Sequence, residues 1–185
     1  HVEFQAVPGG VRFIFPKDME FFEKIAGIKL KNAKICAFGS THRKDKNPEE
    51  DANFASLLSA NTQVVCLFGK AWDLHVTEIL KTTLENNKKI VYQSVKFFKD
   101  KDKEVIFDAE HFFDGYKNNP KYAMAVLESA VKGGADVLSL CDTNGGTYPL
   151  DVYNIVKAVK EKFPDVSVGI HCHEDTGCAT ASTLM

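Results

Sequence analysis

Short apolar runs rich in β-branched residues alternate along this chain with longer segments in which apolar residues recur every three or four positions. Runs of the first kind are typical of buried β-strands, and segments of the second kind are typical of amphipathic helices. The strands predicted in this way cover residues 34–38, 63–68, 104–108, 137–141 and 166–170. Because strands and helices alternate and no hairpin signal joins two strands, the pattern predicts parallel α/β architecture.

The helices between these strands are marked by their start and stop signals. The first helix is expected at 17–26, and the second begins after the N-cap Asn47 with Pro48 as its first residue. The third is expected at 75–99, the fourth runs from Pro120 to a stop at Gly133-Gly134, and the fifth runs from Pro149 to about residue 163. For 75–99 a second interpretation stays open, in which the helix breaks near 86–87 and a short strand occupies 89–92. At the N-terminus, 8–10 is compatible with a turn and 11–15 with a strand.

Two parallel α/β folds fit this order, a doubly wound sheet and a (β/α)8 TIM barrel. No Gly-x-Gly-x-x-Gly fingerprint follows any predicted strand, which weakens the dinucleotide-binding form of the doubly wound sheet. Polar residues instead follow nearly every strand, at the face where barrel active sites are assembled; they are Ser40-Thr41, Asp108 to Glu110, Asp142-Thr143-Asn144 and His171 to His173. We therefore expect an incomplete (β/α)8 barrel, roughly strands two to seven, as one domain over 1–185.

His171 and His173 are the most specific candidate for chemistry in the chain. On a strand, side chains two residues apart project to the same face, and their Cα atoms lie roughly 6.6 Å apart. Two imidazoles at this spacing can converge on one cation. A polar strand end with satisfied imidazoles is the alternative, but the position after a buried strand and before an acidic, glycine-containing loop favours the metal.

Composition excludes several classes of partner. The chain has 185 residues, 44% of them hydrophobic, and a formal net charge of −2, without a basic stripe that would fit nucleic acid. No apolar stretch is long enough to span a bilayer, and no secretory leader is expected. Five cysteines without framework spacing indicate reduced thiols in a cytoplasmic protein.

Four motifs in this chain resemble those of the citramalate synthase and 2-isopropylmalate synthase family. They are Trp72-Asp-Leu-His-Val-Thr-Glu78, Asp108-Ala-Glu-His-Phe-Phe-Asp-Gly-Tyr116, Asp142-Thr-Asn-Gly-Gly146 and His171-Cys-His-Glu-Asp-Thr-Gly-Cys-Ala179. The family belongs to the metal-dependent barrels that include homocitrate synthase and hydroxymethylglutaryl-CoA lyase. The resemblance covers about residues 16–185, and its first two motifs look closer to citramalate synthases than to 2-isopropylmalate synthases.

The resemblance implies a condensation of acetyl-CoA with a small 2-oxo acid, pyruvate by preference, assisted by a divalent metal ion. It matches His171 and His173 to the metal ligands, Thr143 to the residue that binds the oxo-acid carboxylate, and Glu110 to the glutamate near the substrate. His75 and Asp142 are further expected substrate contacts. Imidazole and carboxylate ligands leave Mn²⁺, Mg²⁺ and Zn²⁺ open. A homodimer is the family expectation for the full-length enzyme.

Some family features are not found in this sequence. The strand-one aspartate and arginine and the strand-eight asparagine have no match, and residues 1–15 lack the expected turn, so we expect a fragment that is inactive alone. A structural role is the alternative for Asp142, as an acceptor of amide hydrogen bonds from its loop. Glu110 in a salt bridge and His75 as a helix N-terminal contact are the corresponding alternatives. Besides 2-isopropylmalate synthase, a non-catalytic α/β scaffold module stays open as a function.

Overall fold

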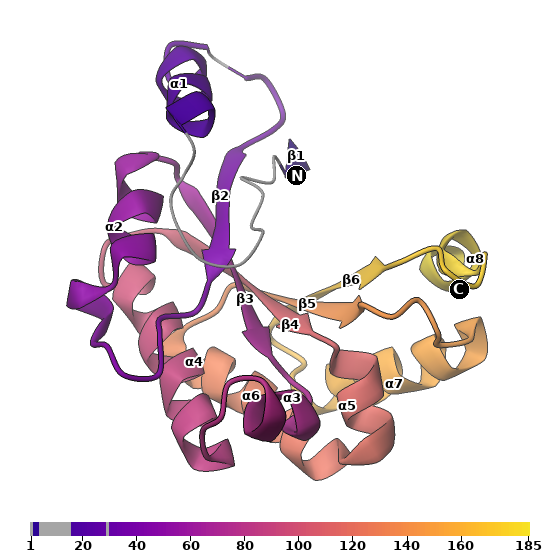
Figure 1. Cartoon of the computed structure of the whole chain (residues 1–185). Helices are drawn as coiled ribbons and strands as arrows, with labels where there is room; N and C mark the ends of the chain where they lie inside the picture. Colours follow the sequence, from indigo (N-terminus) through magenta and orange to yellow (C-terminus); the bar gives the residue numbers. More distant parts are fainter. Residues whose placement is uncertain (1, 4–15, 29) are drawn as a thin grey trace.

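The computed structural model of the chain describes residues 2–3, 16–28 and 30–185. Within these residues six parallel strands form one sheet in the order β1-β2-β3-β4-β5-β6 (Figure 1). The strands are β1 Val2–Glu3, β2 Ile35–Ser40, β3 Val64–Lys70, β4 Glu104–Glu110, β5 Val137–Asp142 and β6 Ser167–Cys172. Each strand therefore pairs with the next one in the chain, as in a (β/α)8 barrel, whereas a doubly wound sheet reverses its order at a switch point. The prediction of a partial barrel is confirmed.

Helices cover one face of the sheet, and most of them lie in the crossovers between successive strands (Figure 1). They are α1 Pro16–Ile25, the 3₁₀ turn η1 Pro48–Glu50, α2 Ala52–Ser59, α3 Asp73–Glu78, α4 Leu84–Lys99, α5 Phe112–Asn118, α6 Pro120–Gly133, α7 Pro149–Lys162 and α8 Ala179–Leu184. None of the helices in the described part of the chain combines the length and the apolar character needed to cross a bilayer. The predicted turn at 8–10 and strand at 11–15 lie outside the described residues.

The prediction for 75–99 was wrong in both of its forms. The chain breaks between α3 and α4, where Lys81 has a left-handed φ of 51° that a helix cannot contain. Thr83 then caps α4, because its hydroxyl oxygen accepts a hydrogen bond from the amide of Asn86 at 3.1 Å. Residues 89–92 lie inside α4 and form no strand.

One other local prediction also needs correction, and one helix was missed. Asn47 makes no side-chain cap, and the residues after it form only the short turn η1. The N-cap of α2 is Asp51, whose carboxylate accepts from the amides of Arg43 at 2.8 Å and Asn53 at 2.9 Å. Helix α5 was not predicted at all, whereas α6 ends as expected, at Gly134 with φ 97°.

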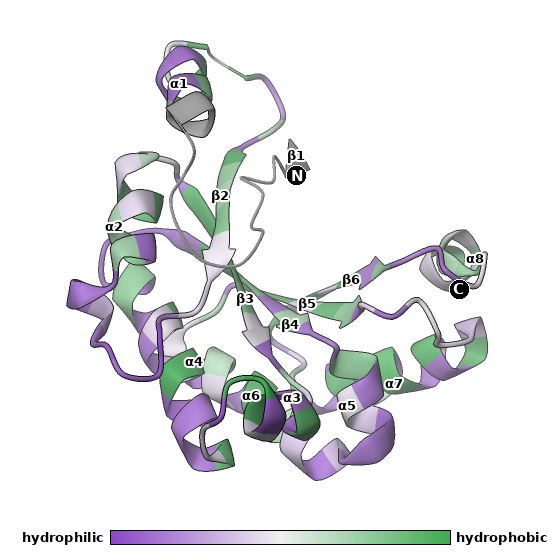
Figure 2. Cartoon of the chain, in the orientation of Figure 1, coloured by the Kyte–Doolittle hydropathy of each residue, from purple (hydrophilic) through white to green (hydrophobic). Residues whose placement is uncertain are grey.

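The alternation of side chains along the strands separates two kinds of surface. The helix-facing side carries fully buried residues such as Leu67, Phe107 and Leu140, which pack with the helices in the main core. The opposite, inner side carries a smaller cluster of Cys36, Val64, Cys66 and Ile106. Figure 2 shows apolar residues along the strands and hydrophilic ones over much of the helix surfaces.

This alternation decides which candidate side chains can meet. Asp108 and Glu110 share the inner face with Ile106, because they follow it at intervals of two residues. His171 lies on the inner face of β6, since Ile170 beside it packs into the main core. Asp142 has the parity of Leu140 and faces the helices.

Candidate active site

His171 and His173 lie at the carboxyl end of β6, with their rings on the same side. The ring centroids are 5.1 Å apart and the planes are inclined by 56°. Two imidazoles bound to one ion at Zn–N distances of about 2.0–2.1 Å have centroids roughly 4.5–5.2 Å apart. The pair therefore has a spacing that fits a shared divalent cation, and the exposed ring of His173 gives access from solvent.

Asp108 lies next to this pair on the inner face of β4. Its Oδ2 is 3.6 Å from Nδ1 of His171, and the residue is only 5% exposed. Burial by itself raises the pKa of Asp108, but interactions with the side chains of His171, Ser139 and Cys141 outweigh burial, so that the pKa is lowered. The carboxyl group is therefore ionised at neutral pH.

Cys141, on β5 between these strands, completes a group of three possible donors. The donor atoms of Asp108, Cys141 and His171 all lie within 4.8 Å of one another. The sequence identified Asp108 only as a polar strand end and Cys141 only as one of five reduced thiols. The two-residue alternation of β4 and β5 was the available signal that both face inward, but the strand register was needed to bring them to His171.

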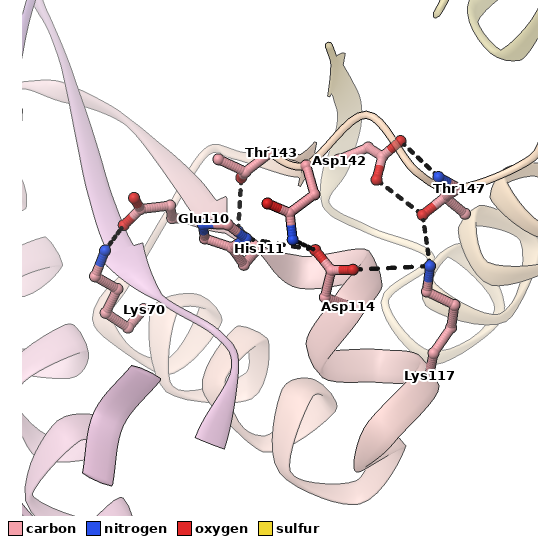
Figure 3. Close-up of polar contacts among 9 residues, drawn as sticks. Lys70, Glu110, His111, Asp114, Lys117, Asp142, Thr143 and Thr147 are labelled. Carbon is pink, nitrogen blue, oxygen red and sulfur yellow. Dashed lines mark hydrogen bonds and ion pairs between the residues drawn. The ribbon is translucent and has the colours of Figure 1, made fainter. Parts of the chain in front are cut away.

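Glu110 and Lys70 form an ion pair at the ends of β4 and β3 (Figure 3). The register pairs these two residues directly, and Oε2 of Glu110 lies 2.5 Å from Nζ of Lys70. Both side chains are largely buried, with exposed fractions of 23% and 17%. The salt-bridge interpretation of Glu110 thus agrees with this geometry, and sequence reasoning did not identify Lys70.

His75 belongs to a cluster of aromatic rings beside this ion pair. Its ring centroid lies 4.7 Å from that of Trp72 and 4.3 Å from that of His111. Nδ1 of His75 and Nε1 of Trp72 are buried and have no hydrogen-bond partner among the described residues. The pKa of His75 is lowered, first by desolvation and then by the neighbouring His111 and Lys70. His75 is therefore neutral at neutral pH.

Asp142 is the last residue of β5 and Thr143 follows it, and their side chains point to different surroundings (Figure 3). The hydroxyl oxygen of Thr143 accepts a hydrogen bond from the amide of His111 at 2.9 Å, which joins the ends of β5 and β4. Asp142 is 2% exposed and accepts from the amide of Thr147 at 3.0 Å and from its hydroxyl at 2.8 Å. The Asp142 carboxylate thus orders its own loop.

The same loop is tied to the loop that follows the histidine pair. The amide of His173 donates to the carbonyl of Asp142 at 3.2 Å, and the hydroxyl of Thr176 donates to the carbonyl of Gly145 at 2.7 Å. Gly145 has a φ of 59°, and a Cβ on it would lie 2.7 Å from Oδ2 of Asp175. The absence of a side chain at Gly145 therefore allows the two loops to approach each other closely.

Comparisons with known proteins find relatives in two groups of enzymes. The chain is 56% identical to the (R)-citramalate synthase of Aquifex aeolicus over 179 residues, which are 97% of this chain and 34% of that protein. It is 28% identical to the 2-isopropylmalate synthase of Photorhabdus laumondii over 172 residues, which are 91% of this chain and 32% of that protein. The chain thus spans about a third of the length of the curated relatives it matches.

The fold and the family agree as well. The HMG-CoA lyase of Bacillus subtilis superposes with a TM-score of 0.71 at 18% identity, over 92% of this chain and 57% of the lyase. At this identity the likeness concerns the fold alone. The sequence profile of the HMGL-like family matches residues 2–185. The expected family resemblance is confirmed, and the chain belongs to the HMGL-like family.

Proposed function

We propose that this chain carries the strand-end site of an enzyme that condenses acetyl-CoA with pyruvate to give citramalate and CoA. The observation that supports this proposal is the difference in identity between two groups of relatives. Citramalate synthases match at 40–56% over nearly the whole chain, whereas 2-isopropylmalate synthases match at 27–29%. The preference for pyruvate over the larger 2-oxoisovalerate rests on this difference.

In this proposal His171 and His173 hold the divalent ion, for which the spacing of their rings is suitable. When bound, this ion supplies Lewis-acid polarisation of the 2-oxo group. The imidazoles leave Mn²⁺, Mg²⁺ and Zn²⁺ open as its identity. The remaining chemistry is assigned to side chains at the ends of β3, β4 and β5.

Thr143 is assigned to the carboxylate of the oxo acid. Its oxygen accepts from the His111 amide, and a hydroxyl that accepts one hydrogen bond still carries a proton to donate. This donation would fix the oxo acid against the end of β5. Asp142 contributes by holding the loop in which Thr143 lies, through its two hydrogen bonds to Thr147.

Glu110 and His75 are assigned to the positioning of the oxo acid and to proton transfer. The ion pair with Lys70 keeps the Glu110 carboxylate oriented at the end of β4. His75 has a lowered pKa, and a neutral imidazole can accept a proton or a hydrogen bond. A base removes one proton from the acetyl methyl group, and the carbanion adds to the 2-oxo carbon. The resulting alkoxide takes up one proton to become a hydroxyl group, and water then cleaves the thioester to release citramalate and CoA.

We further infer a cytoplasmic enzyme that works as a homodimer. The compartment is inferred from the five cysteines, which form no disulfide with one another. The dimer is an expectation for the full-length family member, and the molecular mass of the purified enzyme in solution tests it. No nucleic-acid or membrane partner is proposed, because the sequence has no basic stripe.

A chimaeric enzyme tests the proposed reaction, because the chain spans about a third of the length of its relatives. The matched segment of the Aquifex aeolicus enzyme is replaced by this chain, and CoA release from acetyl-CoA is followed with pyruvate or 2-oxoisovalerate, with Mn²⁺ or Mg²⁺ added. We expect release with pyruvate, and its loss in His171→Ala and His173→Ala. Glu174→Gln, an exposed neighbour of the pair, is the matched control and should retain activity.

Each result separates the proposal from its alternatives. Faster release with 2-oxoisovalerate would favour a 2-isopropylmalate synthase. A folded chimaera that releases no CoA with either oxo acid would overturn the enzyme and leave a scaffold module. Activity that survives both histidine substitutions would overturn their assignment as metal ligands.

A further inference from the structure

A second set of donor groups lies on the inner face of the sheet and shares only His171 with the histidine pair. It consists of Asp108 on β4, Cys141 on β5 and His171 on β6, whose donor atoms all lie within 4.8 Å of one another. Asp108 and Cys141 are buried, at 5% and 3% exposed. The side chain of His171 is 36% exposed and is the part of the group that solvent reaches.

The strand register explains why these three side chains meet. Cys141 pairs directly with His171 across β5 and β6, and Asp108 pairs with Ser139, two residues before Cys141. All three donors point to the same face, and neighbouring strands lie about 4.8 Å apart. The donors are therefore held together by the backbone hydrogen bonds of three adjacent strands.

The separation of Asp108 from His171 is informative. Oδ2 of Asp108 and Nδ1 of His171 are 3.6 Å apart, which is within the range of an ion pair. Two ligands of one tetrahedral ion, each about 2.0–2.3 Å from the metal, are roughly 3.3–3.7 Å apart. The observed distance is therefore compatible with one ion shared by the two groups as well as with a direct ion pair between them.

We propose that Asp108, Cys141 and His171 form a second metal site, which takes a thiophilic divalent cation of the Zn²⁺ type. One carboxylate, one thiolate and one imidazole form a ligand set of this kind, with a fourth position left for water. Binding releases one proton from the Cys141 thiol, and the two anionic ligands then balance the two charges of the ion. This balance suits a buried position, where an uncompensated charge is costly.

The two sites exclude each other, since His171 can serve one ion at a time. Mg²⁺ and Mn²⁺ prefer oxygen and imidazole ligands, whereas thiolate favours Zn²⁺. If the proposed function holds, Zn²⁺ bound at Asp108, Cys141 and His171 would take His171 away from His173 and slow the condensation. The binding proposal itself does not depend on that function.

Titration of the whole chain with Co²⁺ under reducing conditions tests the second site. Cobalt is a spectroscopic substitute for Zn²⁺, and a thiolate ligand gives an intense near-ultraviolet charge-transfer band. We expect this band to saturate at one Co²⁺ per chain and to be displaced by Zn²⁺. Cys141→Ser should abolish the band, and Asp108→Asn should weaken Co²⁺ binding at least tenfold, the scale of effect seen when metal sites lose supporting groups.

Two variants serve as matched controls. Cys172→Ser removes a thiol next to His171 that faces the other side of β6, and it should leave the band unchanged. His173→Ala removes the second histidine of the pair, and it should also retain the band. Far-ultraviolet circular dichroism of every variant verifies that the fold is kept.

The outcomes decide the proposal without any assay of activity. Absence of a charge-transfer band in the folded wild-type chain would overturn it. A band that survives Cys141→Ser, or that disappears in Cys172→Ser or His173→Ala, would assign the thiolate or imidazole to a different site and would also overturn it. Since no acetyl-CoA or oxo acid is present, failure here is distinct from failure of the proposed condensation.

Discussion

Gly145 allows the contact between the two loops of the candidate site to be tested by a single methyl group. Gly145→Ala adds a Cβ where φ is 59°, at 2.7 Å from Oδ2 of Asp175 and 2.9 Å from its backbone nitrogen. Two further glycines separate the contributions. Gly177 has a φ of 70° but open space around it, and Gly146 has neither a left-handed φ nor an atom within 4 Å of an added Cβ.

The magnitudes follow from these differences. A non-glycine residue in the left-handed region costs about 1–2 kcal/mol, which is the loss of unfolding free energy expected for Gly177→Ala. In Gly145→Ala the overpacking against Asp175 adds about 1–3 kcal/mol, so that the total loss is about 2–5 kcal/mol. For Gly146→Ala we expect a change within about 1 kcal/mol, because the reduced freedom of the unfolded chain favours alanine slightly.

Urea denaturation of the three variants and the wild-type chain, followed by circular dichroism, measures these losses as shifts of the midpoint at constant m-value. The order of stability should be Gly146→Ala, then Gly177→Ala, then Gly145→Ala as the least stable. Equal losses in Gly145→Ala and Gly177→Ala would show that the Asp175 contact contributes nothing. A loss in Gly146→Ala as large as in Gly145→Ala would refute the reasoning about both glycines.

Three further predictions concern stability elsewhere in the chain. Burial raises the pKa of Tyr122 to about 12, above its ordinary value of 10.0, despite the hydrogen bond that Tyr122 accepts from Asn87. The folded state therefore favours the neutral phenol, and the resulting stabilisation is complete below pH 10 and is lost as the pH rises towards 12. Over this range the free energy of unfolding should fall less in Tyr122→Phe than in the wild type. In urea denaturation, Phe107→Ala should lower the free energy of unfolding by about 3–5 kcal/mol because Phe107 is fully buried. Tyr148 is 64% exposed, and Tyr148→Ala should change this free energy by less than about 0.5 kcal/mol. Similar losses in the two variants would contradict the assigned core. Thr83→Ala should lose about 1 kcal/mol, while Thr83→Ser, which keeps the capping hydroxyl, should lose clearly less.

Strands β2 to β6 and the fold class were predictable because each of these strands has a local pattern of apolar residues, whereas the two-residue strand β1 was not predicted. A run such as Val64 to Phe68 is apolar at every position, as expected of a strand covered on both faces, and the order of strands and helices then indicates a parallel barrel. Caps and breaks were less predictable. Both Asn47 and Asp51 are suitable N-cap residues, and only the packed chain shows that Asp51 is used, with the Arg43 amide as an additional donor.

The candidate site was predictable only as far as its residues are close in sequence. His171 and His173 are two positions apart on a strand, so their common direction follows from the alternation of side chains alone. Asp108 and Cys141 are brought to His171 by the registers of β4 with β5 and of β5 with β6, which no local pattern reveals. The resemblance to the family also identifies the two histidines, because a sequence motif contains only residues that are close together in the chain.

The two sets of donor groups around His171 favour different metal ions. His171 lies between two donor sets, an imidazole on one side at a centroid distance of 5.1 Å and a carboxylate and a thiol on the other within 4.8 Å. The first set is accessible to solvent and suits several divalent ions, whereas the second is buried and contains sulfur. In the proposed arrangement of two sites, the orientation of the His171 ring decides which class of ion is bound, and we expect substitution of Cys141 to shift that choice away from Zn²⁺ without removing either histidine.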